Sequence, residues 1–583
     1  MIRTLAFAFL LSCLGFNASA AYSTPGTGVH WTLDSLVAYA NGDVTHSGGG
    51  VYNVYGTIFI SANDTLSISS DATVMYAGGT HMDVNGVLLI DPPTAVVFTA
   101  QSISSGFNGL RIDSSNATVL RNFTLEYAVS LRINDSSPLI DSSTFQYNNN
   151  GTSTSFGNGA ISLFRSSPVI TNSQFLNNNR AAIQGGSNIA NAPKIINCLF
   201  QGNNTTNQNV PQINLGASGT DTTKILNCQI LQASTNSGGI GFLPTGTLRT
   251  VISGNLIKNN RYGITLAGGS LINALISYNV IDSNNTQNNP NLGGSGIAFS
   301  GGAAGNHQNS IVTGNVFRGN LWGITILNRA KPNLGNLTNA DTTDDGKNEF
   351  IGNTNSMTAY IDLYNNTVDT IYAQNNYWGT TSAATAEDRI FHYNDTTSLG
   401  FVIYEPIQTT APLSVILEHF GAVKEGNTVA LEWATSAEKH LSHFNIQRST
   451  DGNRFTTVAR VDATGDGNYN YTDVPETNNT RLYYRLKAVN RDGSHSFSKT
   501  VSLQWGGMSS ISFAPNPAHD VLYITGPDPE LVCITDLNGR LVLQQQLQAG
   551  ARSVDISKLA PGLYLIGITA VGGHITGKLQ VVR

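Results

Sequence analysis

Charged residues are scarce in this sequence. Asp, Glu, Lys and Arg make up 12% of its 583 residues, and the formal net charge is −6. A typical soluble protein has about 25% of these residues. Nucleic acids and anionic lipid surfaces are bound by clustered Lys and Arg, which this composition does not supply. We therefore expect no nucleic-acid partner.

Cysteines and long apolar segments are also few. Beyond residue 20 the chain holds Cys198, Cys228 and Cys533, with neither a C-x-x-C pair nor the spacing of a zinc site. A chain of this size with 40% hydrophobic residues can build a core without disulfides, so we expect these cysteines to be packing residues. No stretch after residue 20 is apolar enough to span a bilayer, which excludes an integral helical membrane protein.

The one long apolar segment lies at the N-terminus. Residues 1–20 read MIRTLAFAFLLSCLGFNASA, with Arg3 before the apolar run and Ala18-Ser19-Ala20 at its end. A basic start, an apolar stretch and small residues at a cleavage site are typical of a secretory signal peptide. We expect a mature, exported chain that begins near Ala21.

Asparagine and glycine are abundant instead. The sequence has 59 Gly and 63 Asn, and 48 of the Asn lie between residues 101 and 400. Charged residues become about twice as frequent beyond residue 405. This change of composition indicates a domain boundary there.

The segment 100–380 is a repeat. Each unit has one apolar anchor followed by asparagines, as in SQFLNNN (173–179), and a short strand such as WGITI (322–326) usually follows. The anchors, 24 to 36 residues apart, are Phe145, Phe175, Phe200, Ile230, Ile257, Ile281, Phe317, Phe350 and Tyr377. Strands this short cannot bury a face alone and must stack on the neighbouring repeats.

Two polar columns accompany the anchors. The column two residues before the anchor is Ser143, Ser173, Cys198, Cys228, Asn255, Asn279, Asn315, Asn348 and Asn375. The column three residues after it is Asn148, Asn178, Asn203, Ala233, Asn260, Asn284, Asn320 and Asn353. Positions two apart in a strand share a face, so the first column points inward with the anchors. Asparagine favours turns, and stacked amides can bond along parallel strands. The columns therefore predict a parallel β-solenoid in which the two cysteines are small inner substitutes.

Three phrases carry a family resemblance: SGNLIKNNRYGITL, TGNVFRGNLWGITI and the closing AQNNYWG (373–379). Through them the segment resembles the right-handed parallel β-helix proteins, which include pectate lyases and many surface proteins. The resemblance implies such a helix over residues 21–405, but not one function, because the scaffold carries lyases, hydrolases, epimerases and adhesins. Residues 30–42 predict an amphipathic cap helix, with Thr32 as its N-cap and Gly42 just past its end.

Two further modules follow. Residues 411–506 have longer alternating strands around Trp433, which predict a β-sandwich. FNIQRSTDG and YYRLKAVNRDG within it resemble fibronectin type III-like modules, for which a spacer role is expected. Residues 509–583 predict a second small β-sandwich, with Asn538-Gly539 as a hairpin turn. The whole chain is thus expected to be all-β, a solenoid followed by two small sandwiches.

The last module also has a characteristic order of phrases: FAPNPAHDVLYI (513–524), ITDLNGRLV (534–542), VDISKLAPGLYLIGI (554–568) and the basic end GKLQVVR (577–583). This set resembles the C-terminal sorting domain of the type IX secretion system. The resemblance implies a Gram-negative, Bacteroidetes-type source, contact with the secretion machinery through residues 509–583, and delivery to the outer-membrane surface or the medium.

Charged residues on consecutive repeats form a candidate catalytic group. The position after the anchor points outward, and it holds Lys258, Asp282 and Arg318, about 5 Å apart between strands. In an active site, Lys or Arg would be the base and Asp its partner. In a surface ladder, each ion pair would contribute at most about 1 kcal/mol. Asp282 between two cations would keep both protonated, which favours the ladder.

Two further groups are candidates for binding. Five residues after the anchor, Arg180, Tyr262 and Trp322 can contact sugar rings and hydroxyls or pack against the adjacent turn. The loop DTTDDGKNE (341–349) brings Asp341, Asp344 and Asp345 together, which suggests Ca²⁺, although the spacing departs from D-x-[DN]-x-[DN]-G. No other cofactor is expected.

Three classes of function remain open at this point. The first is a monomeric surface protein that binds polysaccharide or a cell-surface glycan, which suits a charge-poor helix with tandem β-modules. The second is a polysaccharide lyase or glycoside hydrolase, for which only Lys258, Asp282 and Arg318 offer clustered charge. The third is a purely structural surface layer. The sequence favours binding.

Overall fold

The computed structural model of the chain describes residues 21–582, apart from several internal segments. Those left out are 150–154, 269–270, 303–307, 356–360, 410–415, 439–440, 453, 466, 477–480, 492–494, 499, 506–511, 526–528, 537–539, 549 and 571–572. The predicted signal peptide, residues 1–20, lies outside the described residues.

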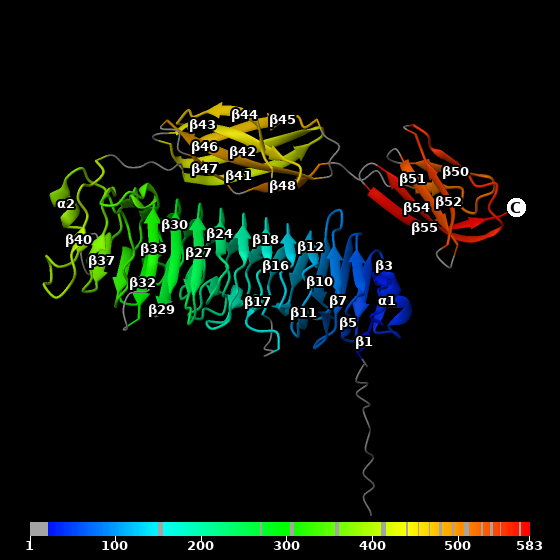
Figure 1. Cartoon of the computed structure of the whole chain (residues 1–583), viewed down its shortest axis with the longest axis horizontal. Helices are drawn as coiled ribbons and strands as arrows, with labels where there is room; N and C mark the ends of the chain where they lie inside the picture. Colours follow the sequence, from blue (N-terminus) through cyan, green and yellow to red (C-terminus); the bar gives the residue numbers. More distant parts are fainter. Residues whose placement is uncertain are drawn as a thin grey trace, which may run out of the picture.

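The described residues between 22 and 391 form a parallel β-helix, as predicted, and its strands lie in three sheets (Figure 1). Sheet A contains β1 (Tyr22–Ser23), β5 (Ile58–Ile60), β8 (His81–Val84), β11 (Phe107–Asp113), β14 (Ala128–Asn134), β17 (Gly159–Phe164), β20 (Ala181–Gly185), β23 (Ile213–Leu215), β26 (Ile240–Phe242), β29 (Ile264–Gly268), β32 (Ser295–Gly301), β35 (Trp322–Leu327), β37 (Leu363–Asn366) and β39 (Ile390–Phe391). Sheet B contains β2 (His30–Trp31), β6 (Thr65–Ile68), β9 (Val87–Ile90), β12 (Val119–Arg121), β15 (Leu139–Asp141), β18 (Val169–Thr171), β21 (Lys194–Ile196), β24 (Thr223–Leu226), β27 (Leu248–Ser253), β30 (Ile272–Ser277) and β33 (Gln308–Thr313). Sheet C contains β3 (Val44–Gly48), β4 (Val51–Val54), β7 (Ala72–Tyr76), β10 (Val96–Ala100), β13 (Phe123–Glu126), β16 (Thr144–Gln146), β19 (Gln174–Leu176), β22 (Leu199–Gln201), β25 (Gln229–Leu231), β28 (Leu256–Lys258), β31 (Val280–Asp282), β34 (Val316–Arg318) and β36 (Glu349–Ile351). From β4 to β33 each rung runs from sheet C to sheet A to sheet B, and its strands pair in parallel with their counterparts one rung away, whereas β3 and β4 form an antiparallel pair.

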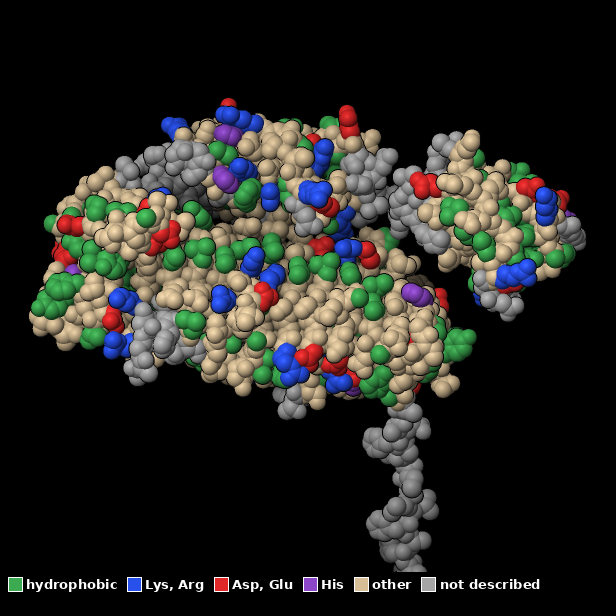
Figure 2. Space-filling model, viewed as in Figure 1, with side chains coloured by type: hydrophobic (Ala, Val, Ile, Leu, Met, Phe, Trp, Pro, Cys, Tyr) green, Lys and Arg blue, Asp and Glu red, His purple; other side chains and the backbone are tan. Residues whose placement is uncertain are grey.

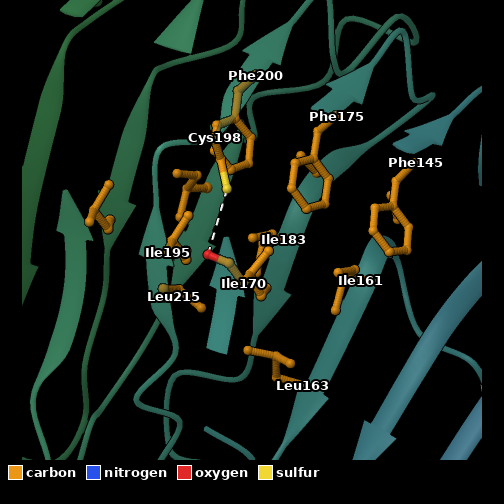
Figure 3. Close-up of a cluster of buried hydrophobic side chains, with 14 of the residues drawn as sticks. Phe145, Ile161, Leu163, Ile170, Phe175, Ile183, Ile195, Cys198, Phe200 and Leu215 are labelled. Carbon is orange, nitrogen blue, oxygen red and sulfur yellow. Dashed lines mark hydrogen bonds between the residues drawn. The ribbon is translucent and has the colours of Figure 1, made fainter. Parts of the chain in front are cut away.

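The anchors fill the interior, as the repeat predicts. Phe145, Phe175 and Phe200 are fully buried and stack on one another, with ring centroids 5.1 and 4.6 Å apart (Figure 3). Burying one such side chain is worth about 1.5–3 kcal/mol. Cys198 lies beside this stack, and its thiol contacts the backbone oxygen of Ile170 at 3.6 Å (Figure 3). The described cysteines are free thiols, in keeping with a packing role.

The inner asparagine column forms a continuous hydrogen-bonded ladder. The side chain of Asn279 is fully buried, and its Nδ2 donates to Oδ1 of Asn315 at 2.9 Å. Asn315 donates in the same way to Asn348 at 3.0 Å. Each amide also bonds to the backbone: Nδ2 of Asn279 donates to the carbonyl of Ile252 at 2.9 Å. The asparagine amides of this column are therefore satisfied by the neighbouring rungs, which confirms the predicted role of the column.

The prediction fails by one residue at the last rung. Asn376, not Asn375, accepts from Nδ2 of Asn348 at 2.9 Å and continues the ladder. Trp378, not Tyr377, is the buried ring, and it stacks on Phe350 with centroids 4.6 Å apart. On the other rungs a left-handed residue directly precedes the ladder position, as Lys347 precedes Asn348, and here that residue is Asn375, with φ +58°. The backbone therefore continues the repeat in register, with Tyr377 paired to Glu349, and the sequence alignment had chosen the wrong one of two adjacent asparagines.

The second column is also a ladder, with one interruption. Asn260 donates to Asn284 at 3.0 Å, and Asn284 to Asn320 at 3.2 Å. Where the sequence has Ala233, the side chain of Gln212 takes the asparagine's place. Its Oε1 accepts from Asn203 at 2.8 Å, and its Nε2 donates to Asn260 at 3.0 Å. The ladder therefore crosses the gap through a residue that lies outside the repeat pattern.

Glycine begins several sheet A strands because the backbone of the next rung leaves no room for a side chain. A Cβ on Gly263 would lie 2.4 Å from the carbonyl oxygen of Gly296, and one on Gly296 would lie 2.7 Å from that of Gly323. This close approach explains the glycine in the phrases YGITL, SGIAF and WGITI.

The N-terminal opening is covered by the predicted cap helix, α1 (Leu33–Tyr39). Thr32 is its N-cap, and the Thr32 side chain accepts from the Ser35 N–H at 3.2 Å. Leu33 and Leu36 are buried against the first rungs. The other end carries the 3-10 helix η1 (Thr342–Asp344), α2 (Ala383–Glu387), and the pair β38 (Ile371–Tyr372) and β40 (Val402–Ile403). Within the described ranges, no helix could cross a membrane.

Two antiparallel β-modules follow, each with its own core. The first contains β41 (Ile416–Glu425), β42 (Thr428–Ala437), β43 (Leu441–Ser449), β44 (Thr456–Asp462), β45 (Asn468–Asp473), β46 (Arg481–Asn490), β47 (His495–Phe497) and β48 (Val501–Gln504). The second contains β49 (Ser512–Ala514), β50 (Val521–Thr525), β51 (Pro529–Thr535), β52 (Leu541–Gln546), β53 (Ser553–Asp555), β54 (Gly562–Ala570) and β55 (Gly573–Val581). Trp433 is buried in the first core, as expected. The likeness of this module to fibronectin type III stays a prediction.

The first module lies beside the helix on the side of sheet B (Figure 1). Burial raises the pKa of Tyr483 in β46 to about 12, and the nearby Asp141 of sheet B adds to the shift. In the same view the sheet A strands are labelled along the opposite side of the helix (Figure 1). Sheet A is therefore the face that this module leaves open.

Candidate functional site

One residue from each strand of sheet A after β1 lies in a row along the helix, in which Asp83, Ser162, Gly241 and Thr325 are buried and the others are partly exposed. Each is paired in register with the next, while the neighbouring positions, such as Met82, Leu110 and Leu131, are buried. We call this set the sheet A row: Phe59, Asp83, Arg111, Arg132, Ser162, Gln184, Asn214, Gly241, Thr265, Ala298, Thr325, Tyr364 and Phe391. It changes along its length from charged to amide, then to small, then to aromatic side chains.

The charged end centres on Asp83, whose side chain is only 2% exposed. Oδ2 of Asp83 accepts from Arg111 at 2.7 Å and lies 3.5 Å from Nε2 of His81. Oδ1 of Asp83 has no donor in the described part of the chain. The buried ring of Phe156, from the connection between β16 and β17, lies edge-on to His81 with centroids 5.2 Å apart. Figure 2 shows blue and red side chains gathered along this lower edge of the helix.

Arg132 is the next residue of the row and differs from Arg111 in its partners. Its Nε donates to Oδ1 of Asn134 at 2.6 Å, and no carboxylate within the described ranges forms an ion pair with it. Burial lowers the pKa of Arg132; Asp113 opposes this shift and Arg111 adds to it. The Arg132 guanidinium also lies 5.4 Å from the ring of Phe164. A half-buried cation of this kind can bind an anionic group such as a carboxylate.

The middle of the row offers amides and then small side chains. Gln184 and Asn214 are partly exposed and in register on adjacent strands. Oε1 of Gln184 has no hydrogen-bond donor in the described structure. Gly241 follows, and a Cβ there would lie 2.8 Å from the ring of Pro211. Amides can bond sugar hydroxyls, whereas the Pro211 ring occupies the space above Gly241.

The far end of the row is aromatic. Tyr364 stacks on Phe391 with ring centroids 5.0 Å apart, and Trp322 lies 5.2 Å from Tyr364. All three side chains are partly exposed. Nε1 of Trp322 donates to the carbonyl of Pro290 at 3.0 Å, which fixes the ring. Rings held at a partly exposed surface are suited to stacking on the apolar face of a sugar.

The predicted catalytic residues lie on sheet C, on three adjacent strands. Asp282 pairs in register with Lys258 on one side and Arg318 on the other. Oδ2 of Asp282 lies 3.1 Å from Nζ of Lys258 and 2.8 Å from Arg318, and Ser283 donates to Oδ1 at 2.7 Å. The Asp282 side chain is 6% exposed. Burial alone would raise the pKa of Asp282, but the bonds from Arg318, Ser283 and Lys258 lower it. The arrangement suits a neutralised surface ladder, and a catalytic role stays a prediction.

The ladder makes a direct prediction for Lys258. Replacing Lys258 with Met removes one cation, but Asp282 keeps its bonds to Arg318 and Ser283. Because the Lys258 side chain is 36% exposed, we expect the free energy of unfolding to fall by no more than about 1 kcal/mol. Glycan binding should be unchanged. Chemical denaturation and a binding assay check this, and loss of a polysaccharide-cleaving activity in K258M would instead identify Lys258 as the base.

The three predicted binding residues lie at the same edge of sheet A but on separate rungs. Arg180 precedes β20, Tyr262 precedes β29, and Trp322 begins β35. Tyr262 packs under the neighbouring connection, since a Cβ on Gly238 would lie 2.1 Å from its ring, and burial raises the pKa of Tyr262 to about 12. Of the three, the structure brings Trp322 to the aromatic end of the row.

The predicted calcium loop is held by hydrogen bonds. Asp341 caps η1 and accepts from the backbone and side chain of Thr343 at 2.9 and 2.6 Å. Oδ2 of Asp344 accepts from Nδ2 of Asn333 at 2.5 Å and from Nδ2 of Asn339 at 2.9 Å. These amides present nitrogen to the carboxylate, whereas calcium needs oxygen ligands. Asp345 bonds to Asn375 through its backbone oxygen. Within the described ranges no three acidic, His or Cys side chains form a metal-binding group.

The sheet A row was missed by the sequence interpretation, which aligned the repeat on the sheet C anchors. The signal that could have found it is the second residue after the glycine in the glycine-led phrases. That position is Thr265 in YGITL, Ala298 in SGIAF and Thr325 in WGITI.

Comparison with known proteins identifies the last module. A family model described as "Secretion system C-terminal sorting domain" matches residues 512–582. This match shows how the protein leaves the cell. The protein is secreted through the type IX secretion system to the cell surface or the extracellular space, and its sorting domain interacts with that machinery.

No curated protein matches the chain. Among similar solved structures is a mutant tailspike protein of E. coli bacteriophage HK620 in complex with a pentasaccharide; it is 10% identical, over 81% of this chain and 87% of that chain, with a TM-score of 0.31. Another is the structure of the FN1–FN3 domains of chicken CNTN1, which is 16% identical over 31% of this chain and 73% of that chain, with a TM-score of 0.14. A third is the BSP domain of a biofilm-associated protein, which is 13% identical over 30% of this chain and 30% of that chain, with a TM-score of 0.13. These scores are too low to support an argument about function.

Proposed function

We propose that this secreted protein binds a polysaccharide along the sheet A row without cleaving it. The observation that carries the proposal is the row itself, which runs in register from β5 to β39 and ends in the partly exposed ring stack of Tyr364 and Phe391. A long, regular row suits a long, regular ligand, because successive rungs, about 4.8 Å apart, can contact successive parts of one chain.

The chemistry of the row supports a glycan. Aromatic rings at one end can stack on sugar rings, and Gln184 and Asn214 can bond to hydroxyls. At the other end Arg132, a cation without an ion-pair partner in the described structure, can bind the carboxylate of a uronic acid. The first C-terminal module lies on the sheet B side, so it leaves the row accessible.

The alternative function is cleavage of the polysaccharide. The protein would then be a polysaccharide lyase or, as a less favoured reading, a glycoside hydrolase. A lyase needs a base near neutral pH, and a hydrolase needs two carboxyl groups in defined roles. At Lys258, Asp282 and Arg318 the only carboxylate is bonded to both cations. On the row, Asp83 is buried and bonded to Arg111. Neither arrangement supplies a free acid and base together.

The test is a panel of uronic-acid and neutral polysaccharides, assayed with the mature full-length chain for both binding and product release. We expect saturable binding, with no new reducing ends and no unsaturated-sugar absorbance, with or without calcium. Product release from any member of the panel would overturn the non-cleaving assignment and favour the enzyme. Absence of binding across the panel would overturn the proposal itself.

Tyr364→Ala locates the binding surface. Losing one stacking ring should weaken polysaccharide affinity about 3- to 10-fold, which corresponds to about 0.5–1.5 kcal/mol. Tyr278→Ala is the matched control, because Tyr278 is 61% exposed and lies at the turn between sheets B and C. Isothermal titration of both variants measures the difference. Equal affinities for the two would place the glycan away from the aromatic end of the row.

A further inference from the structure

A separate concave site lies at the N-terminal end of the helix. It is a cavity of about 490 Å³ lined by residues of β1, β2, α1 and the chain between them. The lining side chains include Tyr22, Pro25, Val29, Trp31, Ser35 and Tyr39. Binding sites for small molecules usually have volumes of about 300–1,000 Å³. We call this site the N-terminal groove.

The wall of the groove is fixed by a buried carboxylate. Asp64 is 0% exposed, and its oxygens accept from the N–H groups of Gly26, Gly28 and Val29 at 2.8, 2.9 and 2.9 Å. Burial raises the pKa of Asp64, but these bonds and one from Thr24 outweigh burial and hold the pKa below its usual value. The carboxylate therefore stays ionised. The segment that forms the wall is thus held in one conformation, which reduces the entropy lost on binding.

The floor and rim of the groove are aromatic. Trp31 is buried and lies edge-on to Tyr22 and to Tyr39, with ring centroids 6.0 and 5.7 Å apart. Tyr39 is 64% exposed and Val29 is 41% exposed, although both line the groove. Apolar surface that stays exposed inside a fixed cavity gains free energy when a ligand covers it.

The polar groups of the groove favour an uncharged partner with hydroxyl groups. None of the lining residues is Asp, Glu, Lys or Arg. The Nε1–H of Trp31 is closed off from the solvent, so the polar side chains that a ligand can meet are those of Ser35, His30 and the tyrosines. These groups could bond ligand hydroxyls. A pyranose ring combines an apolar face with such hydroxyls.

We propose that the N-terminal groove binds a neutral mono- or disaccharide. A purely apolar ligand would leave the hydroxyls of Ser35 and the tyrosines without partners, and a charged one would find no carboxylate, lysine or arginine on the lining residues. The site adjoins the first residue of the sheet A row, because the lining residue Ser23 pairs in register with Phe59, but its aromatic lining residues Tyr22, Trp31 and Tyr39 lie outside the row.

The experiment measures binding of neutral mono- and disaccharides to the mature full-length chain by saturation-transfer NMR and calorimetry. Glucose, galactose, mannose, N-acetylglucosamine and cellobiose cover the common hydroxyl arrangements. We expect at least one to bind, and Tyr39→Ala to weaken it about 3- to 10-fold. Tyr55→Ala is the matched control, since Tyr55 is 48% exposed and does not line the groove.

Two further variants separate the possible outcomes. Tyr39→Phe keeps the ring and should bind nearly as well as the wild type, which excludes misfolding as the cause of the Tyr39→Ala effect. Tyr364→Ala should leave this binding unchanged, because it tests the row and not the groove. The proposal is wrong if no neutral sugar binds, if Tyr39→Ala and Tyr55→Ala bind equally, or if an apolar peptide binds in the groove and sugars do not.

Discussion

Asn279→Ala is expected to lower the free energy of unfolding of the β-helix by about 3–6 kcal/mol. Oδ1 of Asn279 accepts from the N–H and the Nδ2 of Asn255 at 3.0 and 2.8 Å, and its Nδ2 donates to Ile252 and Asn315. Alanine leaves these partners unsatisfied in a fully buried position. Each unsatisfied buried group costs about 1–3 kcal/mol, and part of that cost is relieved by local rearrangement.

Chemical denaturation of the mature chain measures this effect, with Asn309→Ala as the control. Asn309 lies on the outer face of sheet B, where it is exposed, so its loss should change stability by less than about 0.5 kcal/mol. Cys228→Ser is a second control, because Ser143 and Ser173 already occupy the same column on other rungs. If Asn279→Ala were no more destabilising than Asn309→Ala, the ladder would not contribute to stability as argued here.

Deletion of residues 512–583 is expected to abolish delivery to the surface while leaving the rest of the chain folded. The core of the sorting domain shares no residue with the core of the β-helix or with that of the module before it. Its removal therefore exposes no part of the other two cores. Export is lost because the segment that the family match assigns to sorting is absent.

Cell fractionation and protease treatment of intact cells measure this loss. We expect the truncated chain to be retained inside the cell and protected, whereas the full-length chain is released or cleaved at the surface. The matched control removes residues 416–505 and keeps the sorting domain, and it should still be exported. Export of the truncated chain at the full-length level would show that the sorting information lies elsewhere.

Much of the fold could be predicted from the sequence because the helix repeats the same contacts. A buried anchor such as Phe175 needs an apolar residue on every rung, and a buried amide such as Asn315 needs a partner one rung away. Both requirements leave a visible pattern. The pattern was misaligned at the last rung, where the adjacent Asn375 and Asn376 offered two alignments, and it failed where Gln212 replaced an asparagine from outside the repeat.

The candidate site was harder to predict for a geometric reason. The connection from sheet C to sheet A has 3 residues between β34 and β35 but 12 between β31 and β32. Positions on sheet A therefore cannot be counted from the anchors on sheet C. Counting residues from the anchors did predict positions within sheet C, since it placed Lys258, Asp282 and Arg318 on adjacent strands. Those residues are ion-paired with one another, however, and the sheet A row could not be found in the same way.

The stacking of rungs also determines how the molecule responds to pulling along its axis. Strands run across the axis, so the hydrogen bonds between rungs lie along it and carry the load, with one rung interface following another in series. The force at which such a series of interfaces parts is the force at which its least stable interface yields. Between β5 and β37, the sheet A strands that pair through the fewest residues are β20 and β23, through Ile183 and Gln184, and the amide ladder nearby passes through Gln212. Under tension, the helix is expected to part at this rung first, and the rungs on either side would keep their own cores.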